Sequence, residues 1–384
     1  LFATITKQTE TKGTYADLYY NCAATWRMIQ TQPFKLYQSI ETMKDFPTWI
    51  EFGDKLEDYA TPHYFMPMKD PKAVFKGLTD PPEVMASFLN YGSILWEDYD
   101  KKIVNTAPAI CNFDSFCYNP ENCPEDRMNS WGVMFDREWK GKVAIQDVAT
   151  YDYWETGLYL VHNKMMPAPK LGVSQLGIED IDTITDFFIK VKKTGQFRAF
   201  WTDYGELVSL LAAGEVWIGD IWQPGSMDTR RKGTPNRYAV AKEGYRGWFG
   251  GDTMSNAVGP DMRQFCTKLM DWHSTSGWFA QYIQRVGYSV SFYKSPLVKK
   301  AMGPEYWGWA YGGQSTYKPV PKEEQGTFVP EKYEWSMEEG TPDPNGSKRD
   351  CGSIEERTAN IGMWESWPDN ADYMLTSWEK VRRA

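Results

Sequence analysis

Residues 202–252 constrain the fold of this chain more than any other stretch. Apolar residues recur at helical spacing from Leu207 to Ala213, and Gly214 follows where a left-handed residue commonly ends a helix. The next run, 216–222, is short, apolar and rich in β-branched and aromatic residues, and glycine and proline bound it. That composition predicts a buried strand directly after the helix.

The second half of the same stretch repeats the alternation of helix and strand. It predicts a polar helix near 226–232, a strand at 238–240 and an aromatic, glycine-punctuated run at 248–252. Trp222 and Asp252 then fall just past the ends of strands. Open α/β sheets bind ligands at such positions, so these two residues are candidate site residues.

The order of these motifs resembles the second lobe of the bacterial periplasmic solute-binding proteins, specifically the spermidine/putrescine-binding branch. The shared motifs are Gly-Glu-Val at 214–216, Trp222 at the end of a strand, Gly-Thr-Pro at 233–235 and Lys-Glu-Gly at 242–244. The resemblance implies a type II periplasmic-binding-protein fold of the α/β class. In this fold each of two lobes is a mixed sheet flanked by helices, and hinge crossovers join the lobes.

A second resemblance to the same family covers 130–147. Gly141 supplies a turn, Val143 begins a short strand, and Asp147 falls at the carboxyl end of that strand. Further along the chain, the Gly-Tyr pair that ends at Tyr288 also matches the family pattern. Chain order and motif order therefore agree.

The resemblance implies a division into lobes. Lobe one is expected to comprise 1–114 and 253–302, and lobe two 115–252 and 354–384. The segment 303–353 is an insertion relative to the family, and its aromatic head is either a lid over the cleft or a surface flap packed on its own rings. The family's first strand, helix and second strand have no room before residue 16, so they are absent here or precede residue 1.

Helical periodicity is also clear outside the motifs. The pattern at 178–193 predicts an amphipathic surface helix with acids early and lysines late. A second helix is expected at 83–99 and a C-terminal one at 371–383.

Composition excludes some partners and leaves others open. The net charge is -9 and the pI is about 5.1, which argues against nucleic acid as a partner. The mean hydropathy of -0.57 is typical of a globular protein. The 18 tryptophans and 23 tyrosines suit core packing, sugar platforms or cages for ammonium groups. No apolar run approaches the roughly 18 residues of a membrane span.

The cysteines predict one or two disulfides in an oxidising compartment, with free buried thiols as the alternative. They form no C-x-x-C pair, and with 3 histidines in the chain a metal site is not expected. The six positions are Cys22, Cys111, Cys117, Cys123, Cys266 and Cys351.

Motifs of catalysis are missing from the sequence. It contains no G-x-S-x-G elbow, no H-E-x-x-H and no glycine-rich phosphate loop, so neither an enzyme nor a cofactor is predicted. Acids are plentiful, however, so a glycosidase carboxylate pair stays open and makes a carbohydrate-active enzyme the most distant alternative.

The resemblance also implies a ligand site, and one departure changes it. Trp222, Asp252 and Tyr288 match family site positions, but Val148 and Tyr151 stand where the family has carboxylates. We therefore expect a small cationic ligand, such as a monoamine, a quaternary amine or an amino-acid-like cation, rather than spermidine. The expected site residues are Trp222, Asp252, Tyr288, Tyr151, Asp147, Trp26 and Trp248.

The implied function is transport. The chain would be the periplasmic, or lipoprotein, component of an ABC transporter, a monomer that delivers its solute to a permease in the inner membrane. A sugar- or oligosaccharide-binding protein of the same class is the main alternative, since such proteins also use aromatic platforms.

Overall fold

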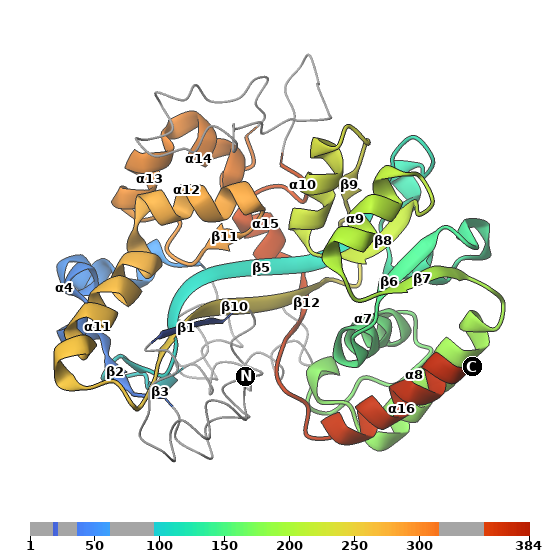
Figure 1. Cartoon of the computed structure of the whole chain (residues 1–384), viewed down its shortest axis with the longest axis horizontal. Coiled ribbons are helices and arrows are strands. Elements are labelled where there is room, and N and C mark those ends of the chain that lie inside the picture. Colours follow the sequence, from blue (N-terminus) through green and yellow to red (C-terminus); the bar gives the residue numbers. More distant parts are fainter. Residues whose placement is uncertain (1–17, 22–36, 62–95, 315–348) are drawn as a thin grey trace.

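The computed structural model describes residues 18–21, 37–61, 96–314 and 349–384. Two lobes lie side by side, and long strands run through both of them (Figure 1). Each lobe has strands flanked by helices, so the predicted two-lobed α/β fold is confirmed.

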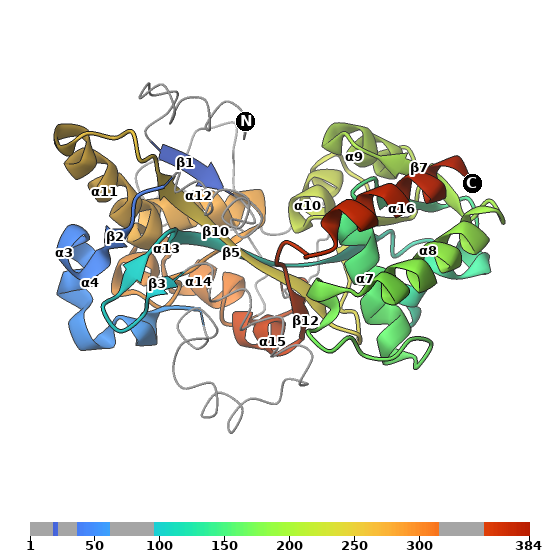
Figure 2. The same cartoon turned by 90° about the horizontal axis from the view of Figure 1, so that it is seen from below.

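Two antiparallel strands join the lobes. β5 (Ala107–Tyr118) and β10 (Tyr245–Met254) pair from Arg246 opposite Asp114 to Asp252 opposite Ala107, with a bulge at Gly250 and Gly251. Figure 2 shows both strands passing between α11 in one lobe and α8 in the other. Every residue of both strands is buried, so the hinge region is also part of the core.

Shorter strands extend this sheet on both sides, in the order β1-β10-β5-β8-β6-β7, with β9, β11 and β12 attached to β5 or β10. β6, β7 and β8 run parallel within lobe two, whereas β1 is antiparallel to β10. A separate three-stranded sheet has the order β2-β4-β3. The remaining strand bounds are β1 Leu18–Asn21, β2 Ile40–Glu41, β3 Trp96–Asp98, β4 Ile103–Val104, β6 Val143–Gln146, β7 Phe197–Trp201, β8 Ile218–Ile221, β9 Arg237–Tyr238, β11 Ser289–Val290 and β12 Ile361–Trp364.

Helices cover the sheets of both lobes. In lobe one these are α3 Thr42–Asp45, α4 Pro47–Phe52, α11 Pro260–Thr275, α12 Gly277–Val286, α13 Pro296–Met302, α14 Pro304–Ala310 and α15 Ile354–Ala359. In lobe two they are α7 Ala149–His162, α8 Ile178–Lys192, α9 Tyr204–Ala212, α10 Gln223–Arg231 and α16 Ala371–Arg383. Short 3-10 helices are η2 Gly53–Lys55, η3 Glu57–Tyr59, η5 Glu125–Arg127, η6 Trp131–Phe135, η7 Arg137–Trp139 and η8 Val173–Gln175.

Local sequence signals account for several of these elements. α9 stops before Gly214, which adopts φ +70° as the left-handed position requires. Trp131, in the family-like segment 130–147, lies in η6 and is 1% exposed. Its indole N–H donates to the carbonyl of Gly244 over 3.0 Å, so the two family-like segments meet in space.

Successive residues of β5 belong to three different hydrophobic cores. The core of lobe one includes Phe113, a second core includes Phe116, and a third includes Cys117. Tyr306 and Trp309, from the head of the predicted insertion, lie buried in the core of lobe one. Residues 315–348 of that insertion fall outside the described residues. The structure therefore locates the aromatic head but does not test whether the insertion forms a lid.

Two expectations are corrected. The C-terminal end of the helix predicted at 83–99 is instead β3, because Trp96 pairs with Val104 in a sheet; residues 83–95 lie outside the described part.

The prediction of disulfides is wrong for the described cysteines, all of which are free thiols. Cys111 and Cys117 lie on the same strand, β5. Six residues of strand span roughly 20 Å, at ~3.3 Å per residue, far beyond the reach of a disulfide. Cys22 lies outside the described residues. Burial raises the pKa of the Cys111 thiol to about 12, so it behaves as a small apolar side chain.

Candidate functional site

A buried group of charges lies where the crossover strands meet α7. Arg246 of β10 is 1% exposed and ion-pairs with three carboxylates. Its Nη2 lies 3.2 Å from Asp114 Oδ2 of β5, and its Nε donates to Glu155 Oε1 of α7 over 2.8 Å. Its Nη1 donates to Glu365, directly after β12. We call Arg246, Asp114, Glu155 and Glu365 the Arg246 cluster.

Two further acids lie beside the Arg246 cluster. Asp220 of β8 and Asp152 of α7 are 2% and 3% exposed, and both interact electrostatically with Glu155. A hollow of about 10 Å³, close to the space one water needs, lies among Asp152, Glu155 and Asp220. Arg246 pairs with three of these five carboxyl groups, and no other lysine or arginine in the described part of the chain pairs with any of them, so the region carries a surplus of acid.

Burial keeps part of this surplus protonated. Desolvation raises the pKa of Glu365 to about 7 and that of Asp220 to about 6, although the positive charge of Arg246 opposes both shifts. Desolvation also raises the pKa values of Asp152 and Glu155 well above their usual range, and neighbouring carboxylates add to the effect. A cation that entered here would therefore displace protons.

Stability should decrease as pH rises through this region's titration range. Glu365 and Asp220 titrate at higher pH in the folded protein than their ordinary values of 4.5 and 3.8, so the folded state holds more protons between about pH 4 and pH 7. The free energy of unfolding should fall across that interval, by several kcal/mol in order of magnitude. Urea unfolding at a series of pH values measures this slope.

A variant isolates the contribution of one group. Glu365→Gln cannot ionise, so its free energy of unfolding should depend less steeply on pH than that of the wild type. Equal slopes for the two proteins between pH 5 and pH 8 would contradict the assignment of a raised pKa to Glu365.

Three of the predicted site rings connect to the Arg246 cluster. The ring of Tyr151 lies 3.7 Å from the guanidinium carbon of Arg246. The indole N–H of Trp248 donates to Asp114 Oδ2 over 2.8 Å, and the rings of Trp248 and Tyr288 meet edge to face with centroids 5.2 Å apart. Tyr151, packed on the core of lobe two, and Trp248, in the core of lobe one, thus contact the Arg246 cluster directly, and Tyr288 is linked to it through Trp248.

Trp222 stands at the start of α10. Its ring stacks on Tyr204 at a centroid distance of 6.2 Å and an interplanar angle of 18°. The turn before Tyr288 comes close to α10, since a Cβ at Gly287 would lie 3.0 Å from the backbone nitrogen of Pro224. Trp222 and Tyr288 therefore lie on neighbouring elements of different lobes, and both side chains are partly exposed.

Asp252 and Asp147 already have partners elsewhere. Asp252 accepts from, or donates to, His273 Nδ1 over 2.7 Å, and desolvation raises its pKa while His273 opposes the shift. It is six residues from Arg246 on β10, roughly 20 Å along the strand. Asp147 accepts from the Trp378 indole over 2.7 Å and from Arg382 Nη2 over 2.6 Å, which fixes α16 to the end of β6.

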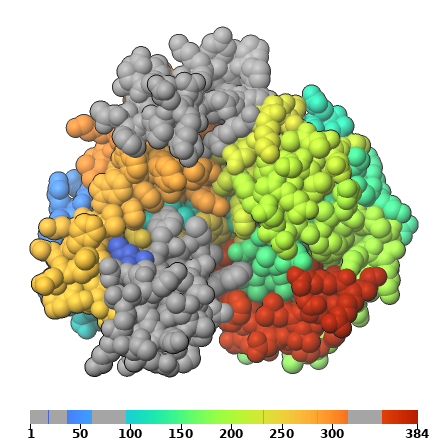
Figure 3. All heavy atoms as spheres, viewed as in Figure 1, coloured from blue at the N-terminus to red at the C-terminus, as the bar shows by residue number. Residues whose placement is uncertain are grey.

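The surface around Asp147 carries a pocket of about 410 Å³ between α7 and α16. The space-filling view also shows a hollow between the two lobes, with α7 on one of its walls (Figure 3). Trp26, the remaining candidate, lies outside the described residues.

Sequence reasoning missed the Arg246 cluster itself. One signal was present: Asp114 and Arg246 are charged residues inside runs that otherwise predict buried strands. Among the described residues no group of acids, histidines and cysteines suits a metal ion, and none of the helices has the length and apolar composition of a membrane span.

Comparison by sequence gives no matching family and no matching curated protein. Comparison by structure gives many matches. A putative spermidine/putrescine ABC transporter protein from Listeria monocytogenes superimposes with a TM-score of 0.56 at 14% identity, over 99% of this chain and 88% of that one. The binding protein MotA of A. tumefaciens B6, solved with glucopine, gives 0.57 at 11% identity, over 100% and 88%.

A third match is the spermidine/putrescine substrate-binding protein PotD of Streptococcus pneumoniae, with a TM-score of 0.52 at 12% identity, over 100% of this chain and 89% of that one. At identities this low, the structural matches establish a shared fold alone. Two long crossover strands join the lobes, and the matches extend over nearly the whole length of the chain. The chain therefore belongs to the type II periplasmic-binding-protein fold class.

Proposed function

We propose that this chain is the solute-binding component of an ABC importer, which takes a cationic, amine-type solute between its lobes and delivers it to a membrane permease. The observation that carries the proposal is the surplus of buried carboxyl groups around Arg246. An ammonium group would supply the missing positive charge and would replace protons rather than create an unpaired ion.

The neighbouring rings support the same solute class. Tyr151 and Trp248 contact the Arg246 cluster, Tyr288 packs against Trp248, and ammonium groups bind to aromatic faces with ~0.5–2 kcal/mol per contact. Two of the solved structures that share the fold are named for spermidine and putrescine, and a third holds glucopine. The proposal includes a monomer outside the cytoplasm and the predicted division into lobes, except that α15 is assigned to lobe one, since Ile354 packs in the core of that lobe.

Ligand-induced stabilisation tests the proposal. Putrescine, spermidine, quaternary amines, amino acids and oligosaccharides should be screened by thermal shift, because a ligand at 100 times its dissociation constant stabilises the folded state by ~2.7 kcal/mol. We expect amine-bearing compounds to give the shifts. The hit should bind Asp114→Asn at least about 10-fold more weakly, since a charge-assisted hydrogen bond is lost.

Asp136→Asn provides the matched control. Asp136 is partly exposed and pairs with Arg127 at the surface, so the same substitution there should leave binding unchanged. Equal affinities of the two variants for the hit would remove Asp114 and its cluster from the site.

A sugar is the second candidate solute, and the stacked pair Tyr204 and Trp222 favours it. Two partly exposed rings at 18° to one another form a platform of the kind that sugar rings pack against. If oligosaccharides alone raise the melting temperature, and Trp222→Ala abolishes that effect, the chain is a sugar-binding protein instead.

A further inference from the structure

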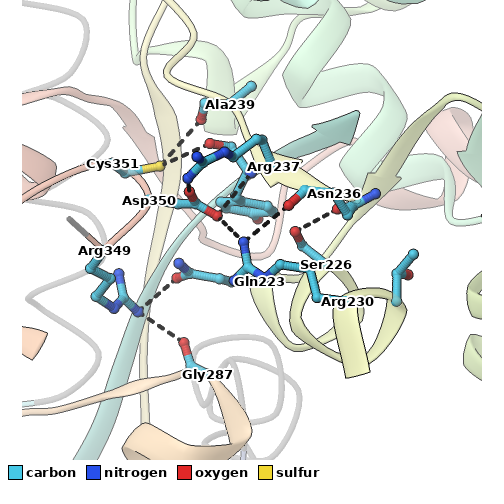
Figure 4. Close-up of polar contacts among 12 residues, drawn as sticks. Gln223, Ser226, Arg230, Asn236, Arg237, Ala239, Gly287, Arg349, Asp350 and Cys351 are labelled. Carbon is cyan, nitrogen blue, oxygen red and sulfur yellow. Dashed lines mark hydrogen bonds and ion pairs between the residues drawn. The ribbon is translucent and has the colours of Figure 1, made fainter. Parts of the chain in front are cut away.

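Arg349 is a buried arginine that bridges the two lobes. It is 3% exposed, and its Nη2 donates to Gln223 Oε1 over 2.8 Å and to the carbonyl of Gly287 over 3.0 Å (Figure 4). Gln223 begins α10 of lobe two, and Gly287 follows α12 of lobe one. Its other terminal nitrogen, Nη1, is buried and has no hydrogen-bond partner among the described residues.

No carboxylate among the described residues balances this charge. Asp350, the next residue, is committed to lobe two: its Oδ2 lies 2.6 Å from Arg230 Nη1, and its Oδ1 lies 3.4 Å from Arg237 Nη1 (Figure 4). Arg357 is 2% exposed and also lacks an acid within the described part of the chain, since it donates to uncharged oxygens such as Ser289 Oγ at 3.0 Å.

Two buried guanidinium groups without a carboxylate are costly for a folded protein. Desolvation and the charge of Arg357 lower the pKa of Arg349 to about 9, which still leaves Arg349 charged at neutral pH. The structure therefore contains a buried cation that bonds to both lobes and keeps one unused donor.

The surroundings of Arg349 favour an anion. Its two partners adjoin the candidate rings: Gln223 follows Trp222, and Gly287 precedes Tyr288. The nine-residue helix α10 starts at Gln223, and its N-cap Trp222 provides no side-chain cap. The first N–H groups of such a helix and its dipole both attract negative charge.

We infer that Arg349 binds a carboxylate of the solute, which makes the solute an amphoteric molecule with an ammonium group at one end and a carboxylate at the other. The inference rests on the proposed function. Trp248 and Tyr288 link the two poles, because Trp248 bonds to Asp114, its ring contacts that of Tyr288, and Tyr288 directly follows the residue that Arg349 bonds to. The solute would lie along these rings, and its carboxylate would tie together the residues that Arg349 bridges.

Pairs of compounds that differ by one carboxylate test this inference. Isothermal titration of the wild-type chain should compare ornithine with putrescine, lysine with cadaverine, and glycine betaine with tetramethylammonium. We expect the carboxylate-bearing member of at least one pair to bind about 10- to 100-fold more tightly, as a charge-assisted hydrogen bond implies. Arg349→Gln should abolish that preference and leave the affinity for the plain amine within about 3-fold.

Asp350→Asn is the control for a merely structural effect. It removes the ion pairs that anchor the same segment to Arg230 and Arg237 but keeps the guanidinium of Arg349. We expect it to lower the affinities of both members of a pair equally and to preserve their ratio. If Arg349→Gln also preserves the ratio, Arg349 does not bind the carboxylate.

The titrations separate this inference from the function on which it rests. Plain amines that bind the wild type as tightly as their carboxylate-bearing partners overturn the role of Arg349 and leave the importer proposal standing. If neither member of any pair binds, while oligosaccharides do, the amine-binding function fails and this inference fails with it.

Discussion

Arg246→Met should destabilise the folded chain by about 3–5 kcal/mol at pH 8, the range for breaking a buried ion pair by removing one partner. The guanidinium pairs with Asp114, Glu155 and Glu365, and all three carboxylates would stay buried without a countercharge. Methionine preserves much of the volume, so the loss would come from charge rather than from a cavity. Urea unfolding followed by circular dichroism measures it.

The same variant should recover much of its stability at pH 5. Protonated carboxyl groups are neutral, and burial has already raised the pKa of Glu365 to about 7, so acid removes the unpaired charges. Arg127→Met is the matched control, because Arg127 is 40% exposed and pairs with Asp136 and Glu138 at the surface. It should destabilise the chain far less than Arg246→Met does at pH 8, and by a similar small amount at either pH. Similar losses in both variants would show that the Arg246 cluster has no special energetic role.

Gly251→Ala should disrupt the junction of the lobes. A Cβ at Gly251 would lie 1.8 Å from the carbonyl oxygen of Ala107 and 3.2 Å from the backbone nitrogen of Ala109. Both contacts are with the backbone of β5, so no side chain can rotate away, and the bulge at this point would have to open. We expect a loss of about 3 kcal/mol or more and the loss of solute binding.

Gly259→Ala tests whether any added methyl group would do the same. Gly259 has an ordinary φ of -77° at the start of α11, and a Cβ added there would have no neighbouring atom within 4 Å. Gly259 is the N-cap of α11, where alanine is a poorer cap than glycine, so its substitution should cost about 1 kcal/mol at most, well below the loss expected for Gly251→Ala. Guanidinium unfolding of both variants beside the wild type gives the comparison, and a stable Gly251→Ala protein would contradict the close approach of β10 to β5.

Local signals in the sequence were sufficient for much of lobe two. The helix that ends at Gly214, the strand at Val143 and the helix at 178–193 each depend on short-range periodicity and on glycine, and each forms close to its predicted bounds. Motif order then placed these elements in one fold class without any long-range information.

The polar partners could not be predicted in the same way, because they come from distant parts of the chain. Asp147 binds Arg382 from α16, and Asp252 pairs with His273 from α11, so each carboxylate that the sequence offered to a solute has a partner within the protein. The Arg246 cluster likewise gathers residues from β5, α7, β10 and the end of β12. Only the antiparallel register of β5 and β10 sets Asp114 opposite Arg246.

Because β5 contributes to the hydrophobic cores of both lobes, the two lobes should fold and unfold together. β5 supplies Phe113 to one core and Phe116 to another, only three positions further along. Expressing the lobes as separate fragments would divide the paired strands β5 and β10 and leave each fragment with unpaired backbone groups at an exposed apolar sheet edge, which favours aggregation. The two halves should therefore be inseparable as recombinant fragments, and calorimetry of the whole chain should give one cooperative endotherm rather than two.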